Sequence, residues 1–116
     1  MISTETKILE QSVLGTPEQS GVILACRRDE NSDEHIVHSM ASKNAKARQD
    51  HIGYLLNYYR KTGSTEQFDQ SSAGWISVIK KYNGEFYYRY IPTANYSEAR
   101  GLMQYIKRNL ISEDSR

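Results

Sequence analysis

The sequence predicts an α+β fold in which two strand-strand-helix units form a four-stranded antiparallel sheet with two helices on one face. The stretch GWISVIKKYNGEFYYRYIP, residues 74–92, places an Asn-Gly pair between two β-rich runs, a pattern typical of a β-hairpin. Residues 42–63 and 95–110 each carry an apolar stripe at helical spacing. Residues 21–63 and 74–110 align with a one-residue difference in spacing, which indicates either an internal repeat or two ordinary hairpin-helix units.

Length and composition indicate one globular domain that spans residues 1–116. Apolar residues make up 38% and charged residues 25% of the 116 residues, which is ordinary for a globular protein. The apolar run 22–26 is far shorter than the roughly 20 residues of a membrane helix. The N-terminus lacks the order of a secretory signal, and the single Cys26 cannot form an internal disulfide, so we expect a cytoplasmic location.

The first half contains an N-terminal segment and the first unit. In residues 1–20, Ile8 and Leu9 precede a Gly and a Pro, which is compatible with a short helix. In residues 21–63, GVILACRR predicts a strand, DENSDE an acidic turn, HIVHSM a second strand and the remainder a helix from Ser42 to Gly63.

The second half begins with a polar linker, residues 64–73, and ends with a flexible tail, residues 111–116. In the second unit, residues 74–110, the hairpin precedes a helix whose expected N-cap is Asn95, with Glu98 three residues later. Apolar residues at helical spacing give this helix one buried stripe, formed by Ala99, Leu102, Met103, Ile106 and Leu110.

Alternation along the predicted strands separates a core face from a free face. The expected core face carries Val22, Leu24, Cys26, Ile36 and Met40 with Trp75, Ile79, Phe86, Tyr88 and Tyr90. The opposite face is expected to be free, and it mixes apolar, aromatic and basic residues. Such a patch usually has a partner.

The leading functional hypothesis is a small non-catalytic module that binds nucleic acid through this free sheet face. The residues expected to bind are Arg27, Lys80, Tyr82, Tyr87 and Arg89. The cations would neutralise phosphates and the two tyrosines would stack on exposed bases.

Two alternatives use the same face. In the first alternative, two copies form a homodimer that buries Ile76, Val78 and Ile91. The protein would then act as a protein-interaction or inhibitory factor. A weaker alternative is a small anionic or nucleotide ligand in a groove between the two copies.

The residues indicate neither catalysis nor a cofactor. The chain has no nucleophile elbow, no Gly-rich phosphate loop and no metalloprotease His pair. No metal site is expected, because His35 and His38 lie three apart on a predicted strand and point to opposite faces.

Overall fold

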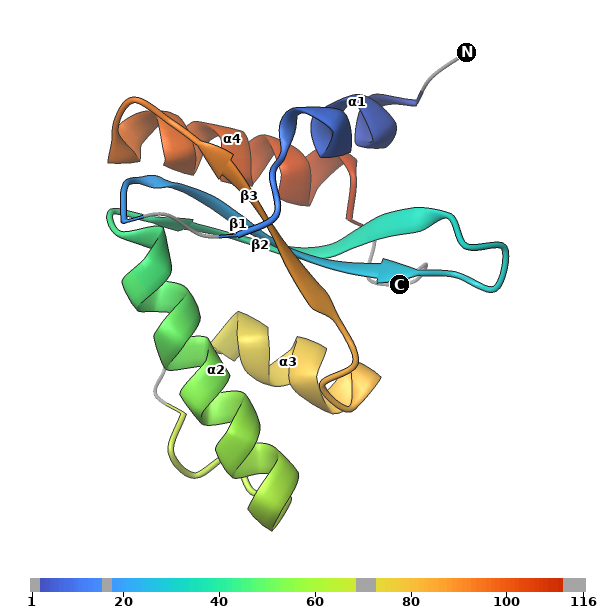
Figure 1. The fold of residues 1–116 in the computed structure, drawn as a ribbon, viewed down its shortest axis with the longest axis vertical. Helices are drawn as coiled ribbons and strands as arrows, with labels where there is room; N and C mark the ends of the chain where they lie inside the picture. Colours follow the sequence, from blue (N-terminus) through green and yellow to red (C-terminus); the bar gives the residue numbers. More distant parts are fainter. Residues whose placement is uncertain (1–2, 16–17, 69–72, 112–116) are drawn as a thin grey trace.

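The computed structural model describes residues 3–15, 18–68 and 73–111. The described residues form four helices and one three-stranded antiparallel sheet (Figure 1), so the overall class is α+β as predicted. In chain order the elements are α1 (Thr4–Gln11), β1 (Gly21–Arg28), β2 (Glu34–Ser42), α2 (Ala45–Thr62), α3 (Ala73–Tyr82), β3 (Tyr87–Pro92) and α4 (Tyr96–Asn109).

The sheet has the strand order β2-β1-β3 and is covered on both faces. Figure 1 shows α2 and α3 below the sheet and α1 and α4 above it. The two faces correspond to two hydrophobic cores. The first core contains Ile23 and Ala25 of β1 with residues of α2 and α3, and the second contains Val22 and Leu24 with residues of α1 and α4.

Strand β1 is the centre of the sheet, and its residues from Val22 to Cys26 are completely buried. Its pairing with β3 ends at Cys26, but its pairing with β2 continues to Arg28 and Glu34. The end of the β1–β2 hairpin therefore projects beyond β3 as an arm, residues 27–35, visible in Figure 1.

The prediction of a strand at the start of residues 74–92 is wrong, because this segment forms helix α3. Trp75, Val78 and Ile79 are all buried in the first core. Their spacing of three and four residues is that of one helix face, whereas a strand would place Val78 and Ile79 on opposite sides. The helix buries all three together, and this packing overrides the β-rich composition of the segment.

The Asn-Gly pair ends a helix and does not connect two strands. Asn83 and Gly84 both have positive φ, 54° and 75°. These are the signs that a two-residue hairpin turn requires, but the Gly84 N–H donates to the Ile79 carbonyl at 3.1 Å, the bond of a Schellman helix end. The chain then enters β3 directly.

The remaining corrections to the predicted fold follow from this helix. Within the described residues the sheet has three strands, not four, and helices cover both of its faces, not one. Residues 74–110 have the order helix-strand-helix, whereas residues 21–63 have the order strand-strand-helix, so the two halves are not structural repeats.

Several local predictions are confirmed. The first unit has the predicted order, α2 ends at Gly63 with φ 71°, and a short helix lies in the N-terminal segment. Helix α2 begins after Asn44 and not at Ser42. The Asn95 side chain accepts a hydrogen bond from the Glu98 N–H at 2.8 Å, as expected of the N-cap of α4. Within the described ranges, no helix is both long enough and apolar enough to span a bilayer.

Substitutions of Ser77, an exposed residue inside α3, test the helical assignment. We expect Ser77→Ala to be the most stable variant, followed by Ser77→Val and then Ser77→Gly, with about 1 kcal/mol between Ala and Gly. Urea denaturation measures these free energies of unfolding. Val more stable than Ala would contradict the helix, because β-branched residues are favoured in strands.

Candidate functional site

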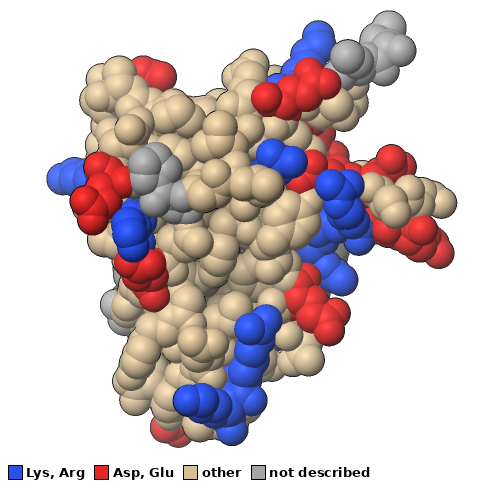
Figure 2. All heavy atoms as spheres, viewed as in Figure 1, with Lys and Arg blue, Asp and Glu red and all other residues tan. Residues whose placement is uncertain are grey.

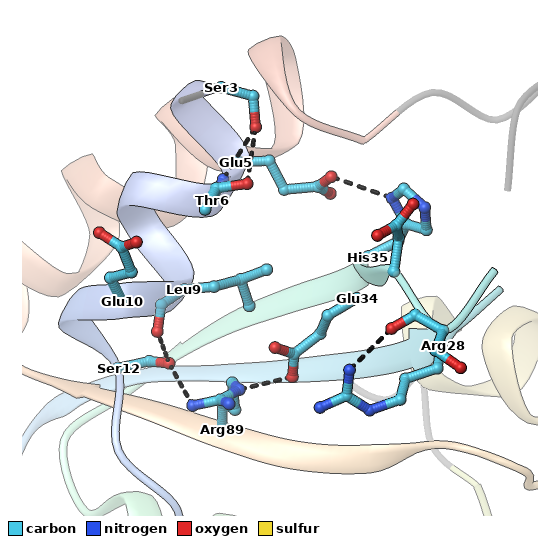
Figure 3. A pocket seen from close by; sticks show the side chains of 12 residues that line it. Ser3, Glu5, Thr6, Leu9, Glu10, Ser12, Arg28, Glu34, His35 and Arg89 are labelled. Atoms are coloured by element: carbon cyan, nitrogen blue, oxygen red, sulfur yellow. Dashed lines mark hydrogen bonds and ion pairs between the residues drawn. The ribbon is translucent and has the colours of Figure 1, made fainter. Parts of the chain in front are cut away.

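A cleft of about 880 Å³ lies between α1 and the hairpin arm (Figure 3). Its walls are mainly polar. Helix α1 contributes Glu5 and Glu10, the arm contributes Arg28 and Glu34, and β3 contributes Arg89.

An ion pair between Glu34 and Arg89 crosses the sheet at one side of this cleft. The Arg89 Nε donates to Glu34 Oε2 at 2.6 Å, and the Tyr87 hydroxyl donates to the same oxygen. Arg89 also donates to the Ser12 Oγ at 3.2 Å, and Ser12 donates to the Leu9 carbonyl at 2.6 Å. This network connects β2 and β3 to the end of α1.

The network keeps Glu34 ionised. Burial raises the pKa of Glu34, but hydrogen bonds from Arg89 and Tyr87 lower it, and the net pKa is below the ordinary value. Burial, followed by the bond to Glu34, raises the pKa of Tyr87. The bond to Glu34 likewise raises the pKa of Arg89. The opposite charges of Glu34 and Arg89 therefore compensate each other.

His35 connects α1 to the tip of the arm on another side of the cleft. Its Nδ1 lies 3.0 Å from Glu5 Oε1 and its Nε2 lies 2.8 Å from Asp29 Oδ2. The second Glu5 oxygen accepts from the Ile36 N–H at 3.0 Å. The bond to His35 is the largest of the causes that lower the pKa of Asp29.

These contacts indicate a structural role for the cleft. The Glu5–His35 and Glu34–Arg89 contacts, drawn as dashed lines in Figure 3, join α1, β2 and β3. In the part of the chain that the structure describes, no group of three or more His, Cys, Asp or Glu residues is placed to hold a metal ion. We call these contacts the brace, because the Glu34–Arg89–Ser12 network and the Glu5–His35 contact hold α1 on the sheet.

A basic and aromatic surface lies on the opposite face, around the C-terminal end of α3. The Arg27 guanidinium carbon lies 4.3 Å from the centroid of the Tyr82 ring, and the Lys81 Nζ lies 5.4 Å from it. The Arg60 side chain of α2 donates to the Gly84 carbonyl at 2.8 Å. With the exposed Lys80 in the last turn of α3, these side chains form what we call the Tyr82 cluster: Arg27, Arg60, Lys80, Lys81 and Tyr82.

The structure divides the five predicted binding residues between two sites. Arg27, Lys80 and Tyr82 lie in the Tyr82 cluster. Tyr87 and Arg89 lie on the other face of the sheet, in the Glu34 network. The free sheet face on which all five were expected together does not exist, because helices cover both faces.

The three predicted interface residues are also separated. Val78 is 7% exposed in the first core and Ile91 is 6% exposed in the second core. Ile76 is half-buried on α3. Two of the three therefore stabilise the fold itself.

Sequence reasoning missed Arg60 and Lys81 of the Tyr82 cluster and the contact of Glu5 with His35. Helical spacing of Trp75, Val78 and Ile79 would have placed Lys81 in the last turn of a helix. The contacts of Glu5 and Arg60 join residues 30 and 24 positions apart, and no local pattern carries them.

Comparisons of the chain with models of protein families, with curated proteins and with solved structures found no match. The chemistry of these surfaces is therefore the basis for a functional proposal.

Replacing Glu34 tests the brace. Glu34→Gln leaves Arg89 without its anion, and we expect a loss of roughly 1–3 kcal/mol in the free energy of unfolding at neutral pH. Glu10→Gln is the matched control, because Glu10 is an exposed residue in the same cleft. We expect this control to stay within about 0.5 kcal/mol of the wild type.

The loss of unfolding free energy in Glu34→Gln should depend on pH. The pKa of Glu34 in the folded protein is lower than its ordinary value of 4.5. The ionised carboxylate therefore contributes its full stabilisation of the fold above pH 4.5, and this contribution disappears as the pH falls through the folded pKa. Urea denaturation across this range should show the wild type and Glu34→Gln converging in acid. An equal difference at every pH would contradict an ionised Glu34 in the brace.

Proposed function

We propose that the protein is a small non-catalytic module that binds single-stranded nucleic acid at the Tyr82 cluster. The observation that supports this proposal most strongly is the Arg27 guanidinium over the Tyr82 ring, which the Lys81 ammonium also approaches, with Lys80 in the same last turn of α3. Guanidinium planes and aromatic rings are surfaces on which unpaired bases stack, and the neighbouring cations suit the phosphates.

The charge distribution supports the same surface. Figure 2 shows basic side chains toward the lower right of the molecule, interrupted by acidic ones, and acidic side chains at the projecting arm. Asp29 and Glu30 of the arm border Arg27 on one side. Their repulsion of phosphates favours a strand that runs from Tyr82 toward Arg60 at the end of α2 and not along the arm.

A second candidate function is interaction with a protein partner or a second copy. Val13 and Leu14 are 48% and 70% exposed, and Val13 forms two backbone hydrogen bonds with Tyr90 at the edge of β3. These residues place exposed apolar area next to a sheet edge, where a homodimer interface would form. This location replaces Val78 and Ile91, which are buried.

Anisotropy of a labelled, mixed-sequence single-stranded oligonucleotide tests the proposed binding. The triple variant Arg27→Met, Lys80→Met and Lys81→Met should weaken binding at least roughly tenfold and lower the slope of log K against log salt by about 2. The matched control is the triple variant Lys7→Met, Lys46→Met and Arg100→Met, which removes the same charge from exposed positions outside the cluster.

Equal weakening by the two triple variants, or binding unchanged by a roughly fourfold rise in salt, would contradict the proposal. Light scattering on the same samples tests the second candidate. A dimer mass without oligonucleotide that Leu14→Asp reduces to the monomer mass would favour protein interaction, and a monomer mass in both would exclude the homodimer.

A further inference from the structure

A second cleft lies along β2, between α3 and the end of α4. Its volume is about 580 Å³, within the roughly 300–1,000 Å³ that is usual for small-molecule sites. Val37 and His38 of β2 line it, Ser77 lines it from α3, and Lys107 and Ile111 line it from the end of α4. Because β2 is an edge strand, this cleft is bounded by both helical layers.

Two buried polar atoms among the residues that line this cleft have no hydrogen-bond partner among the described residues. His38 is 8% exposed, and its Nε2 is one of these atoms. The other is the Tyr82 hydroxyl oxygen. Buried polar atoms in folded proteins nearly always have a partner, and an unsatisfied one is destabilising. Because both atoms belong to residues that line one cleft, they indicate a place for a polar group from outside the chain.

The charges of the lining indicate which polar group fits. Lys81 and Lys107 face the cleft from two different helices, and none of the described lining residues has a carboxylate. Burial, and secondly the positive charge of Lys107, lower the pKa of His38 to about 4. At neutral pH the imidazole is therefore uncharged and able to donate one hydrogen bond, while both lysines carry a positive charge.

The lining also contains apolar side chains. Val37, Val78 and Ile111 border the same space. A ligand that satisfies the whole cleft has a negatively charged end for the lysines and an apolar body for these side chains.

We propose that this cleft binds a small organic anion, a carboxylate or a phosphate monoester attached to an apolar ring or chain. Lys81 and Lys107 contact the anionic group, and His38 and Tyr82 supply the hydrogen bonds. This inference does not depend on the proposed function. Lys81 and Tyr82 border both surfaces, but His38 and Lys107 lie only at this cleft.

NMR titration of the ¹⁵N-labelled protein with benzoate, phenyl phosphate and uncharged benzyl alcohol tests the inference. We expect saturable shifts of the Val37, His38 and Ser77 amides with at least one anion and not with the alcohol. The tighter of the two anions identifies the ligand class. The absence of a saturable shift with both anions, or an alcohol that binds as tightly as they do, would overturn the inference.

Matched variants locate the anionic group. Lys107→Met should weaken binding of the tighter anion roughly tenfold, because it removes a charged partner. Arg108→Met removes the same charge from the next residue, which is exposed but does not line the cleft, and should change the affinity less than about twofold. An equal loss of affinity in the two variants would contradict binding of the anion at this cleft.

His38→Phe separates binding from folding. It removes the unpartnered Nε2 and retains a ring against Trp75, whose centroid lies 4.7 Å away. We expect weaker anion binding with a melting temperature equal to or higher than that of the wild type. Unchanged affinity in a folded His38→Phe variant would contradict the role of the imidazole.

Discussion

The burial of β1 on both faces is the constraint on which the rest of the structure depends. Five consecutive residues, from Val22 to Cys26, have no exposed area, and alternate side chains belong to different cores. A strand that is apolar on both faces requires a helical layer on each side. Helices α1 and α4 supply one layer and α2 and α3 supply the other.

Cys26 is buried in this arrangement, and burial is the main cause that raises its pKa to about 12, so its thiol is unreactive in the folded state.

Much of the fold was predictable because its signals are local. The N-cap of α4 and the order of β1, β2 and α2 depend on residues a few positions apart. Helix α3 was not predicted, because WISVIKKY contains β-branched and aromatic residues and precedes an Asn-Gly pair. That pair allows positive φ at both positions, and a hairpin turn and a helix end both use this property. The spacing of Trp75, Val78 and Ile79 was the signal that distinguished the two.

The wrong strand also misplaced the predicted site. Treating residues 74–92 as two paired strands put Lys80, Tyr82, Tyr87 and Arg89 on one face. The structure keeps Tyr87 and Arg89 on the α1 side of β3 and moves Lys80 and Tyr82 to a helix on the other side. The sequence identifies basic residues that could bind an anion. Whether such a residue is available to a ligand depends on contacts between distant positions, such as the ion pair of Arg89 with Glu34.

The two faces of the sheet therefore differ in what they offer a ligand. On the α1 face, Arg89 is paired with the Glu34 carboxylate within the brace. On the α3 face, Arg27 and Lys81 lie near the Tyr82 ring and Lys107 lines the same cleft as His38. Among the described residues, the His38 Nε2 and the Tyr82 hydroxyl have no hydrogen-bond partner. Both of our proposals, binding of nucleic acid and binding of a small organic anion, therefore concern the α3 side of the protein.

The most direct test of this account is the exposure of methyl groups on the two sides of β1 to a soluble paramagnetic agent in NMR. Ile23 points to one core and Leu24 to the other, and both are completely buried, whereas Leu14 is 70% exposed and serves as the internal reference. With a helical layer on each face, we expect strong relaxation enhancement for the Leu14 methyls and little for Ile23 and Leu24. Enhancement of either β1 residue comparable to that of Leu14 would mean that one sheet face is open to solvent and would contradict the two-sided fold.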